Sequence, residues 1–127
     1  MASATLRGVD FSYELSEESS AEASANRAER PRLPFLNGTG GDLRQRPRLI
    51  DGPLTDACHL LAHDQRGLGQ SGKPDEPYTM ADYADDAAAL LDHVGWSSAH
   101  VLGVSFGGMV AQELALRHPD RIDRLVL

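Results

Sequence analysis

The sequence predicts an α/β fold in which crossover helices join the strands of a mostly parallel sheet. Short apolar segments alternate with longer segments of helical periodicity, and two of the apolar segments run straight into glycine-rich loops. The chain of 127 residues is 41% hydrophobic and 24% charged, which is ordinary for a globular protein with a single core. No internal repeat interrupts this pattern, so we expect residues 1–127 to belong to one domain.

The amino-terminal segment predicts a hairpin of two strands. Apolar and polar residues alternate over Val9–Leu15, which is the period of a half-buried strand, and Gly8 permits a tight turn after a short strand around residues 5–7. From Ser16 to Arg30 the chain consists mainly of Ser, Glu and Ala and cannot bury an apolar face. A frayed helix is one interpretation, and a flexible surface insertion over residues 16–32 is the one we favour.

Two buried strands are expected in the middle of the chain. Residues 33–36 lead into the loop Asn37-Gly38-Thr39-Gly40-Gly41, and residues 58–62 lead into the loop 63–72. Between them, prolines and a glycine keep any helix in residues 42–57 short or broken. Cys58 opens the second of these strands and is expected to be a small buried side chain rather than a catalytic thiol.

Two helices and two strands are expected in the remainder. Thr79 and Asp82 are spaced as a capping box before an amphipathic helix that Gly95 ends, and its acidic residues 85, 86 and 92 are expected to point mainly away from the apolar face. A strand over 99–104, a helix over 106–118 and a strand over 122–127 follow. The apolar face of the first helix consists of Met80, Tyr83, Ala84, Ala87, Leu90, Leu91 and Val94.

The segment Gly103-Val104-Ser105-Phe106-Gly107 lies where a predicted strand becomes a helix, which is the context of a nucleophile elbow. A serine hydroxyl is a useful nucleophile only when it is exposed and a base can reach it, and a sharp turn at the tip of a sheet exposes it. Strand and helix nearly touch at such a turn, so glycines are expected at positions 103 and 107, and Gly108 is expected to let the helix start pack closely. Ser105 is therefore the predicted nucleophile.

Two backbone amides are predicted to form an oxyanion hole beside this serine. The amide of Phe106 follows the nucleophile at a helix amino terminus, whose partial positive charge favours an anion. The amide of Thr39 lies in a glycine-rich loop at the end of a strand, where it can face an anion, although a plain turn is the alternative interpretation. A phosphate-binding loop is disfavoured because the pattern Gly-x-x-x-x-Gly-Lys is absent.

Three segments, in this order along the chain, resemble the α/β-hydrolase fold family. They are Asn37–Gly41 with its preceding strand, where the family often has His-Gly-x, then His63–Ser71, which is similar to the family turn Asp-x-Arg-Gly-x-Gly-x-Ser, and finally the elbow Val101–Met109. The resemblance extends from about Leu6 to Leu127 and implies a mostly parallel sheet of about eight strands, of which this chain supplies roughly the first six. It also implies that Ser105 is the nucleophile, that Phe106 and Thr39 are the oxyanion donors, and that the 64–71 turn is structural.

The family places an acid and then a histidine after the nucleophile, and the residues that follow Ser105 offer only His118, Asp120 and Asp123. His118 ends the helix that begins at the elbow, roughly 18 Å away at 1.5 Å per residue, so it is expected to be a helix-terminal cation. His59, His63, His93 and His100 precede Ser105 and are expected to be surface or strand-edge residues.

We therefore expect the amino-terminal part of an α/β-hydrolase domain, a fragment of a serine hydrolase of carboxylic esters or lactones. Its general base and acid are expected beyond Leu127, and the chain alone is expected to be inactive. A non-catalytic, receptor-like member of the fold and an acyltransferase are the alternatives. A haloalkane-cleaving enzyme is disfavoured because that chemistry needs a carboxylate at position 105.

Composition and charge narrow the expected partners. The net charge of −7 and the lack of a Lys/Arg cluster argue against a nucleic-acid partner. The sequence has no apolar run long enough to span a bilayer and no secretory signal at its amino terminus, so we expect a cytoplasmic protein without a membrane partner. We expect a small ester or lactone as the partner, with no cofactor and no metal. An exposed apolar edge at residues 125–127 is expected to favour aggregation.

Overall fold

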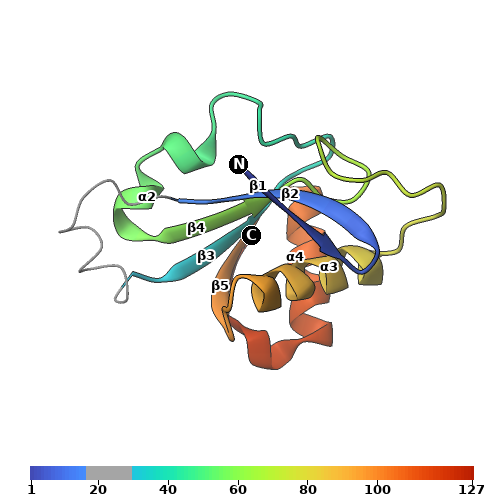
Figure 1. Cartoon of the computed structure of the whole chain (residues 1–127). Coiled ribbons are helices and arrows are strands. Elements are labelled where there is room, and N and C mark those ends of the chain that lie inside the picture. The colour runs from blue at the N-terminus through green and yellow to red at the C-terminus, as the bar shows by residue number, and fades with distance from the viewer. Residues whose placement is uncertain (17–29) are drawn as a thin grey trace.

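The computed structural model describes residues 1–16 and 30–127, which form a six-stranded sheet with helices on its faces (Figure 1). The order of the strands in the sheet is β1-β2-β4-β3-β5-β6. The hairpin β1–β2 is antiparallel and joins β4 antiparallel, whereas β4, β3, β5 and β6 run parallel to one another, which confirms the predicted fold class. The strands are β1 (Ala2–Leu6), β2 (Val9–Leu15), β3 (Arg32–Leu36), β4 (His59–His63), β5 (Ala99–Gly103) and β6 (Ile122–Val126).

The two long helices, α3 (Met80–His93) and α4 (Phe106–Arg117), cover one face of the sheet. The segment that contains the 3₁₀ turn η2 (Leu49–Asp51) and the one-turn helix α2 (Leu54–Ala57) lies over the other face, as Figure 1 shows. A further 3₁₀ turn, η3 (Pro119–Arg121), joins α4 to β6. The expectation of short, broken helix between β3 and β4 is confirmed, because prolines in this segment cannot continue a helical hydrogen-bond ladder.

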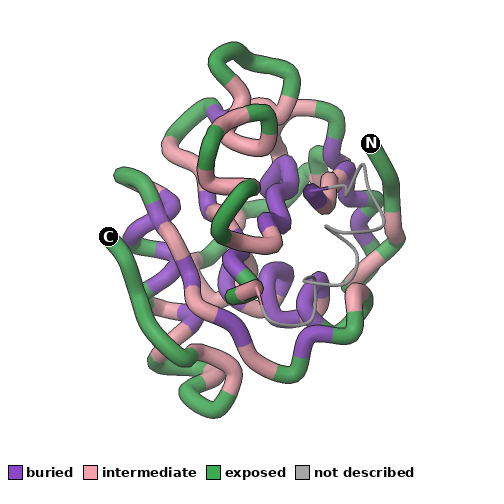
Figure 2. The backbone as a smooth tube through the Cα atoms, turned by 90° about the vertical axis from the view of Figure 1, so that its left-hand side faces the viewer, coloured by how far each residue is buried: buried purple, intermediate pink, exposed green. Residues whose placement is uncertain are grey.

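The main core lies between the sheet and the pair α3–α4. Alanines dominate the helix surfaces there, and their small side chains let both helices pack closely on the sheet and on each other. The tube in Figure 2 shows this buried interior against an exposed carboxyl-terminal strand. The core cluster consists of Leu36, Ala84, Ala87, Ala88, Val101, Val110, Ala111 and Leu114.

The insertion expected over residues 16–32 falls mainly on residues 17–29, which lie outside the described part of the chain. The two ends of the range are described, and both contact the sheet. Ser16 is buried, and its hydroxyl accepts a hydrogen bond of 3.0 Å from the Leu60 amide while its own amide donates to the Leu60 carbonyl. Arg32 is the first residue of β3. The polar composition of residues 16–32 does not reveal these contacts, because both ends join the sheet through hydrogen bonds rather than through apolar side chains.

One strand begins later than expected, and the expected apolar edge at the end of the chain is present. Cys58 caps the carboxyl end of α2 and is half-buried, so β4 begins one residue later than expected. β6 lies at the edge of the sheet, and its last residues are exposed, with Leu127 at 66%. The predicted apolar edge at residues 125–127 is therefore present.

Candidate active site

Ser105 occupies a sharp turn between the end of β5 and the start of α4. Its backbone has φ 54° and ψ −118°, a conformation that costs a residue with a side chain about 1–3 kcal/mol. Ser105 is exposed, and its hydroxyl makes no capping hydrogen bond to the helix that follows. The strand that enters the turn, the helix that leaves it and the exposure of the hydroxyl are as the sequence predicts.

The glycines around the turn differ in whether a Cβ would fit at their position. A Cβ at Gly103 would lie 2.6 Å from the Gly107 carbonyl oxygen, and a Cβ at Gly107 would overlap the Leu36 carbonyl group. Both positions therefore require glycine. A Cβ at Gly108 would meet the Gly103 carbonyl oxygen at 3.5 Å, which is ordinary contact. Gly108 packs beside Gly103 as expected, but the space does not require a glycine there.

The loop after β3 lies directly against the turn. β3 pairs with β5, the Val104 amide donates to the Leu36 carbonyl at 3.1 Å, and a Cβ at Gly38 would be 3.5 Å from the Ser105 Cβ. Within this loop the Asn37 side-chain oxygen accepts from the Gly38 amide at 2.8 Å, so that amide is already used.

The two amides predicted for an oxyanion hole are free. Among residues 1–16 and 30–127, neither the Thr39 amide nor the Phe106 amide donates a hydrogen bond. Phe106 is the first residue of α4, where an amide has no partner inside the helix. The arrangement can therefore hold a negative charge that develops beside Ser105.

No histidine of the chain is placed to act as a base for Ser105. His63 ends β4, two strands away from β5, a separation of about 10 Å at 4.8 Å per strand. Of the two expected positions, surface or strand edge, it has the second, but it is buried against Phe11, and burial lowers its pKa to about 4. His118 ends α4 and contacts the Asp85 carboxylate at 2.8 Å, which confirms its helix-terminal place.

The other histidines agree better with expectation. His93 is exposed at the end of α3, while His59 and His100 are half-buried in strands. Asp123, one of the late acidic residues, lies near the amino end of β6 and accepts from the Ser98 hydroxyl at 3.3 Å. Because β6 runs parallel to β5, that end is the edge opposite Ser105.

The turn after β4 is a tightly bonded structural unit, as the resemblance implies. The Asp64 carboxylate accepts from the Leu43 and Gln70 amides at 2.7 and 2.9 Å, and the Ser71 hydroxyl donates to the Asp64 carbonyl. Arg66 binds Asp86 of α3 through two hydrogen bonds of 2.7 and 2.8 Å, which raises the pKa of the guanidinium.

The expectation that Asp86 points away from the apolar face of α3 is wrong. The residue is 2% exposed and also binds Arg7 from the β1–β2 turn at 2.7 Å. Position 86 is three residues after Tyr83 and four before Leu90, so the helical spacing already puts it on the apolar face. A carboxylate there must have cationic partners, and the partners come from two distant segments.

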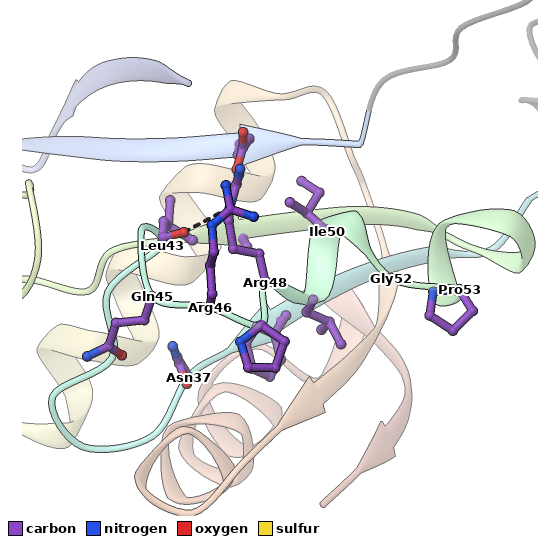
Figure 3. Close-up of a pocket in the computed structure, with 13 residues that line it drawn as sticks. Asn37, Leu43, Gln45, Arg46, Arg48, Ile50, Gly52 and Pro53 are labelled. Atoms are coloured by element: carbon purple, nitrogen blue, oxygen red, sulfur yellow. Dashed lines mark hydrogen bonds and ion pairs between the residues drawn. The ribbon is translucent and has the colours of Figure 1, made fainter.

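One described cleft borders the loop after β3 but does not contain Ser105. It has a volume of about 470 Å³ and lies between the sheet and the segment 43–53, on the face away from α3 and α4 (Figure 3). Asn37 borders it, and Arg48, held by Glu14 and the Leu43 carbonyl, crosses it. The cleft therefore adjoins the glycine-rich loop at Asn37.

The described residues contain no group of His, Cys, Asp and Glu side chains able to hold a metal ion. In the same part of the chain, no helix has the length and apolar character needed to cross a bilayer.

Comparison with known proteins shows which family the chain resembles. A family model described as alpha/beta hydrolase fold matches residues 31–127. The 3-oxoadipate enol-lactonase 2 of Acinetobacter baylyi is 33% identical over 105 residues, which are 83% of this chain and 39% of that protein.

Solved structures give the same result. The enol-lactonase from Burkholderia xenovorans matches with a TM-score of 0.83 and 29% identity, over 98% of this chain and 45% of that one. A hydrolase from Pseudomonas aeruginosa matches with a TM-score of 0.83 and 36% identity, over 99% and 44% respectively. The chain spans less than half the length of these relatives.

Proposed function

This chain belongs to the α/β hydrolase fold family, and from that premise we propose that Ser105 is the nucleophile of a serine hydrolase of carboxylic esters or lactones. One observation carries the proposal: the exposed residue Ser105 lies on a strained turn, the Phe106 amide follows it, and the loop that contains the Thr39 amide lies against it. Neither amide has a partner among the described residues. Strain at a functional position persists only where the surrounding structure imposes it.

The chemistry follows from this arrangement. The Ser105 oxygen attacks the carbonyl carbon while a base takes the hydroxyl proton, and the carbonyl oxygen becomes an oxyanion facing the two amides. When the carbon–oxygen bond to the alcohol breaks, the base returns its proton to the leaving oxygen and an acyl-enzyme remains. Water, deprotonated by the same base, then attacks the acyl carbon, releases the acid and restores the Ser105 hydroxyl. In a lactone both products are parts of one hydroxy acid. The enol-lactonases among the similar proteins support this substrate class.

The general base and the acid that orients it are proposed to come from outside these residues. All five histidines of the sequence are accounted for in the described structure, and none is both free and near Ser105. We expect the chain alone to hydrolyse an activated ester no faster than its Ser105→Ala variant. In this proposal, catalysis needs a histidine from outside these residues that lies at the edge of the sheet where Ser105 is.

Chemical rescue tests the proposal on the chain itself. The chain is mixed with p-nitrophenyl acetate and imidazole, which replaces the absent base, and the acetylated residue is located by peptide mass spectrometry. We expect imidazole-dependent acetylation of Ser105, because general-base assistance is worth about 10²–10⁴-fold. The Ser105→Ala variant is the matched control for acetylation at other nucleophiles. Acetylation confined to amines, equal in both proteins, contradicts the proposal.

The same experiment separates the alternatives. A receptor-like member of the fold binds its ligand without forming an acyl-enzyme, so Ser105 remains unmodified. An acyltransferase forms the same acyl-enzyme, and added thiols or alcohols then accept the acetyl group faster than water does.

A further inference from the structure

Gln65 links the turn after β4 to the loop after β3. Gln65 is 2% exposed, and its side-chain nitrogen donates a hydrogen bond of 2.9 Å to the Asn37 carbonyl oxygen. β3 and β4 are neighbours and parallel, so the segments that leave their carboxyl ends meet at the same edge of the sheet. The contact therefore joins a turn regarded as structural to the loop beside the nucleophile.

The adjacent residue, Asp64, holds the far end of the same loop. Its carboxylate accepts from the Leu43 amide at 2.7 Å. The segment 37–43 is thus attached at its first residue to Gln65 and at its last to Asp64. Asp64 is itself 1% exposed and bound to the Gln70 amide, so the support is rigid. A loop tied at both ends has few other conformations available.

The first of these attachments acts at the point where the loop meets the elbow. The Asn37 carbonyl oxygen would be 2.6 Å from a Cβ at Gly107, and the next residue, Gly38, lies against the Ser105 Cβ. A displacement of Asn37 therefore moves the Thr39 amide relative to the Phe106 amide. Oxyanion stabilisation depends on donors held within about 3 Å of a defined point, so small displacements weaken it.

The hydrogen bonding of Gln65 fits a role beyond stability. Because the Asn37 carbonyl can only accept, the amide nitrogen of Gln65 must face it, and this fixes the orientation of the side chain. The side-chain oxygen is then buried with no partner in the described part of the chain, which lowers the stability of the fold. Stability alone favours an apolar residue at such a place, whereas a donor aimed at the loop needs the amide.

We propose that Gln65 is a positioning residue, whose hydrogen bond to the Asn37 carbonyl sets the place of the Thr39 amide in the oxyanion hole. The proposal rests on the proposed function. Gln65 acts through the loop, and the amides of the loop act on the reacting oxygen.

Two variants remove the donor in different ways. Gln65→Glu keeps the size of the side chain and replaces its donor by an acceptor, and Gln65→Met removes the polar group without burying a charge. Ser71→Ala is the matched control, because the Ser71 hydroxyl is 3% exposed, belongs to the same turn and bonds Asp64 and Ser12 but not Asn37. All three variants are compared at temperatures where circular dichroism shows them folded.

Phenylboronic acid is the probe of the oxyanion hole. The Ser105 oxygen forms a bond to boron and releases its proton to solvent, and the resulting tetrahedral, negatively charged boronate resembles the intermediate of ester cleavage. Its Kd is measured by titration calorimetry for the wild-type chain, for Ser105→Ala and for the three variants. Amide hydrogen exchange of residues 38–41, followed by NMR, reports the order of the loop without any chemistry.

We expect both Gln65 variants to weaken boronate binding about tenfold or more and to raise amide exchange in residues 38–41 by about tenfold. Ser71→Ala is expected to lower the unfolding temperature while leaving the boronate Kd within about twofold. Boronate binding within about twofold of wild type in both Gln65 variants overturns the proposal, and so does unchanged exchange of the loop. If Ser105→Ala binds boronate as the wild type does, the proposed function fails, and loop exchange alone then decides whether Gln65 positions the loop.

Discussion

The two helices that cover the sheet begin in opposite ways. At the start of α3, the Thr79 hydroxyl accepts from the Asp82 amide at 3.1 Å, and the Asp82 carboxylate accepts from the Thr79 amide at 2.9 Å. At the start of α4, the capping position belongs to Ser105, whose side chain makes no such bond and whose backbone is strained. The start of α3 satisfies two of its backbone amides through side chains, whereas the start of α4 leaves the Ser105 hydroxyl and the Phe106 amide without a partner within the part of the chain that the structure describes.

This difference shows where stability and chemistry are separated in the fold. The start of α3 is joined to a buried ion cluster, Arg66–Asp86–Arg7, that ties the helix to the β1–β2 turn and to the turn after β4. The start of α4 is held by close glycine packing and by backbone hydrogen bonds, which leave the Ser105 hydroxyl without a capping bond. We therefore expect substitutions around α3 to change stability and substitutions at Ser105 to change reactivity.

The largest expected effect is at the glycines of the elbow. Gly107→Ala should destabilise the chain by about 4 kcal/mol, because the added Cβ overlaps the Leu36 carbonyl and the sheet backbone cannot yield cheaply. Gly108→Ala is the control and should cost under about 1 kcal/mol, since its Cβ makes only ordinary contacts. Urea denaturation measures both. Equal destabilisation by the two variants contradicts the packing described for the elbow.

The second largest effect on stability is expected at the buried ion cluster. Asp86→Asn leaves the 5%-exposed Arg66 side chain without its anionic partner, which typically costs about 3–5 kcal/mol. Its neighbour Asp85 pairs with Arg117 and His118 near the surface, so Asp85→Asn should cost under about 1 kcal/mol. The two unfolding free energies are compared in urea at pH 7. A similar loss in both variants indicates that the cluster contributes nothing special to the attachment of α3.

The free energy of unfolding should also depend on pH because of His63, which lies beside Ala87 and Leu90 of α3. Burial lowers the pKa of His63 from 6.5 to about 4, so between these values the unfolded chain binds a proton that the folded chain does not. Stability is therefore complete above about pH 6.5 and falls as the pH drops to about 4, by up to ~3 kcal/mol.

Unfolding free energies at a series of pH values test this expectation. His63→Gln should flatten the profile between pH 4 and 6.5, whereas the exposed His93→Gln control should keep the wild-type slope. An unchanged slope in His63→Gln places the pH dependence elsewhere.

The smallest effects compare the two helix starts directly. Thr79→Ala removes the cap of α3 and should cost about 1 kcal/mol without changing acetylation of Ser105 in the presence of imidazole. Ser105→Gly should abolish that acetylation and stabilise the chain by about 1 kcal/mol, because glycine adopts the backbone conformation at φ 54° freely. A destabilised Ser105→Gly variant argues that the elbow is not strained.

Much of this architecture is readable in local sequence patterns. The alternation over Val9–Leu15, the apolar residues before Asn37 and the Thr79–Asp82 box predict the strands and the helix that the structure contains. The glycines at 103 and 107 predict the turn that exposes Ser105. These features are local: side chains a few residues apart set the period, the cap and the turn, so no knowledge of distant segments is needed.

The tertiary structure decided what depends on distant partners. The helical spacing places Asp86 on the apolar face, but only the fold supplies Arg7 and Arg66, the partners that allow a carboxylate to be buried there. His63 is buried because Phe11 and α3 enclose it, and no pattern near His63 reveals this. The contact of Gln65 with Asn37 likewise exists only because β3 and β4 are parallel neighbours. The sequence by itself determined the strands, the helices and the elbow, since backbone geometry is set over a few residues. Strand order decided the ion pairs of Asp86, the burial of His63 and the support of the loop by Gln65. The energies of these contacts depend on which groups the fold brings together.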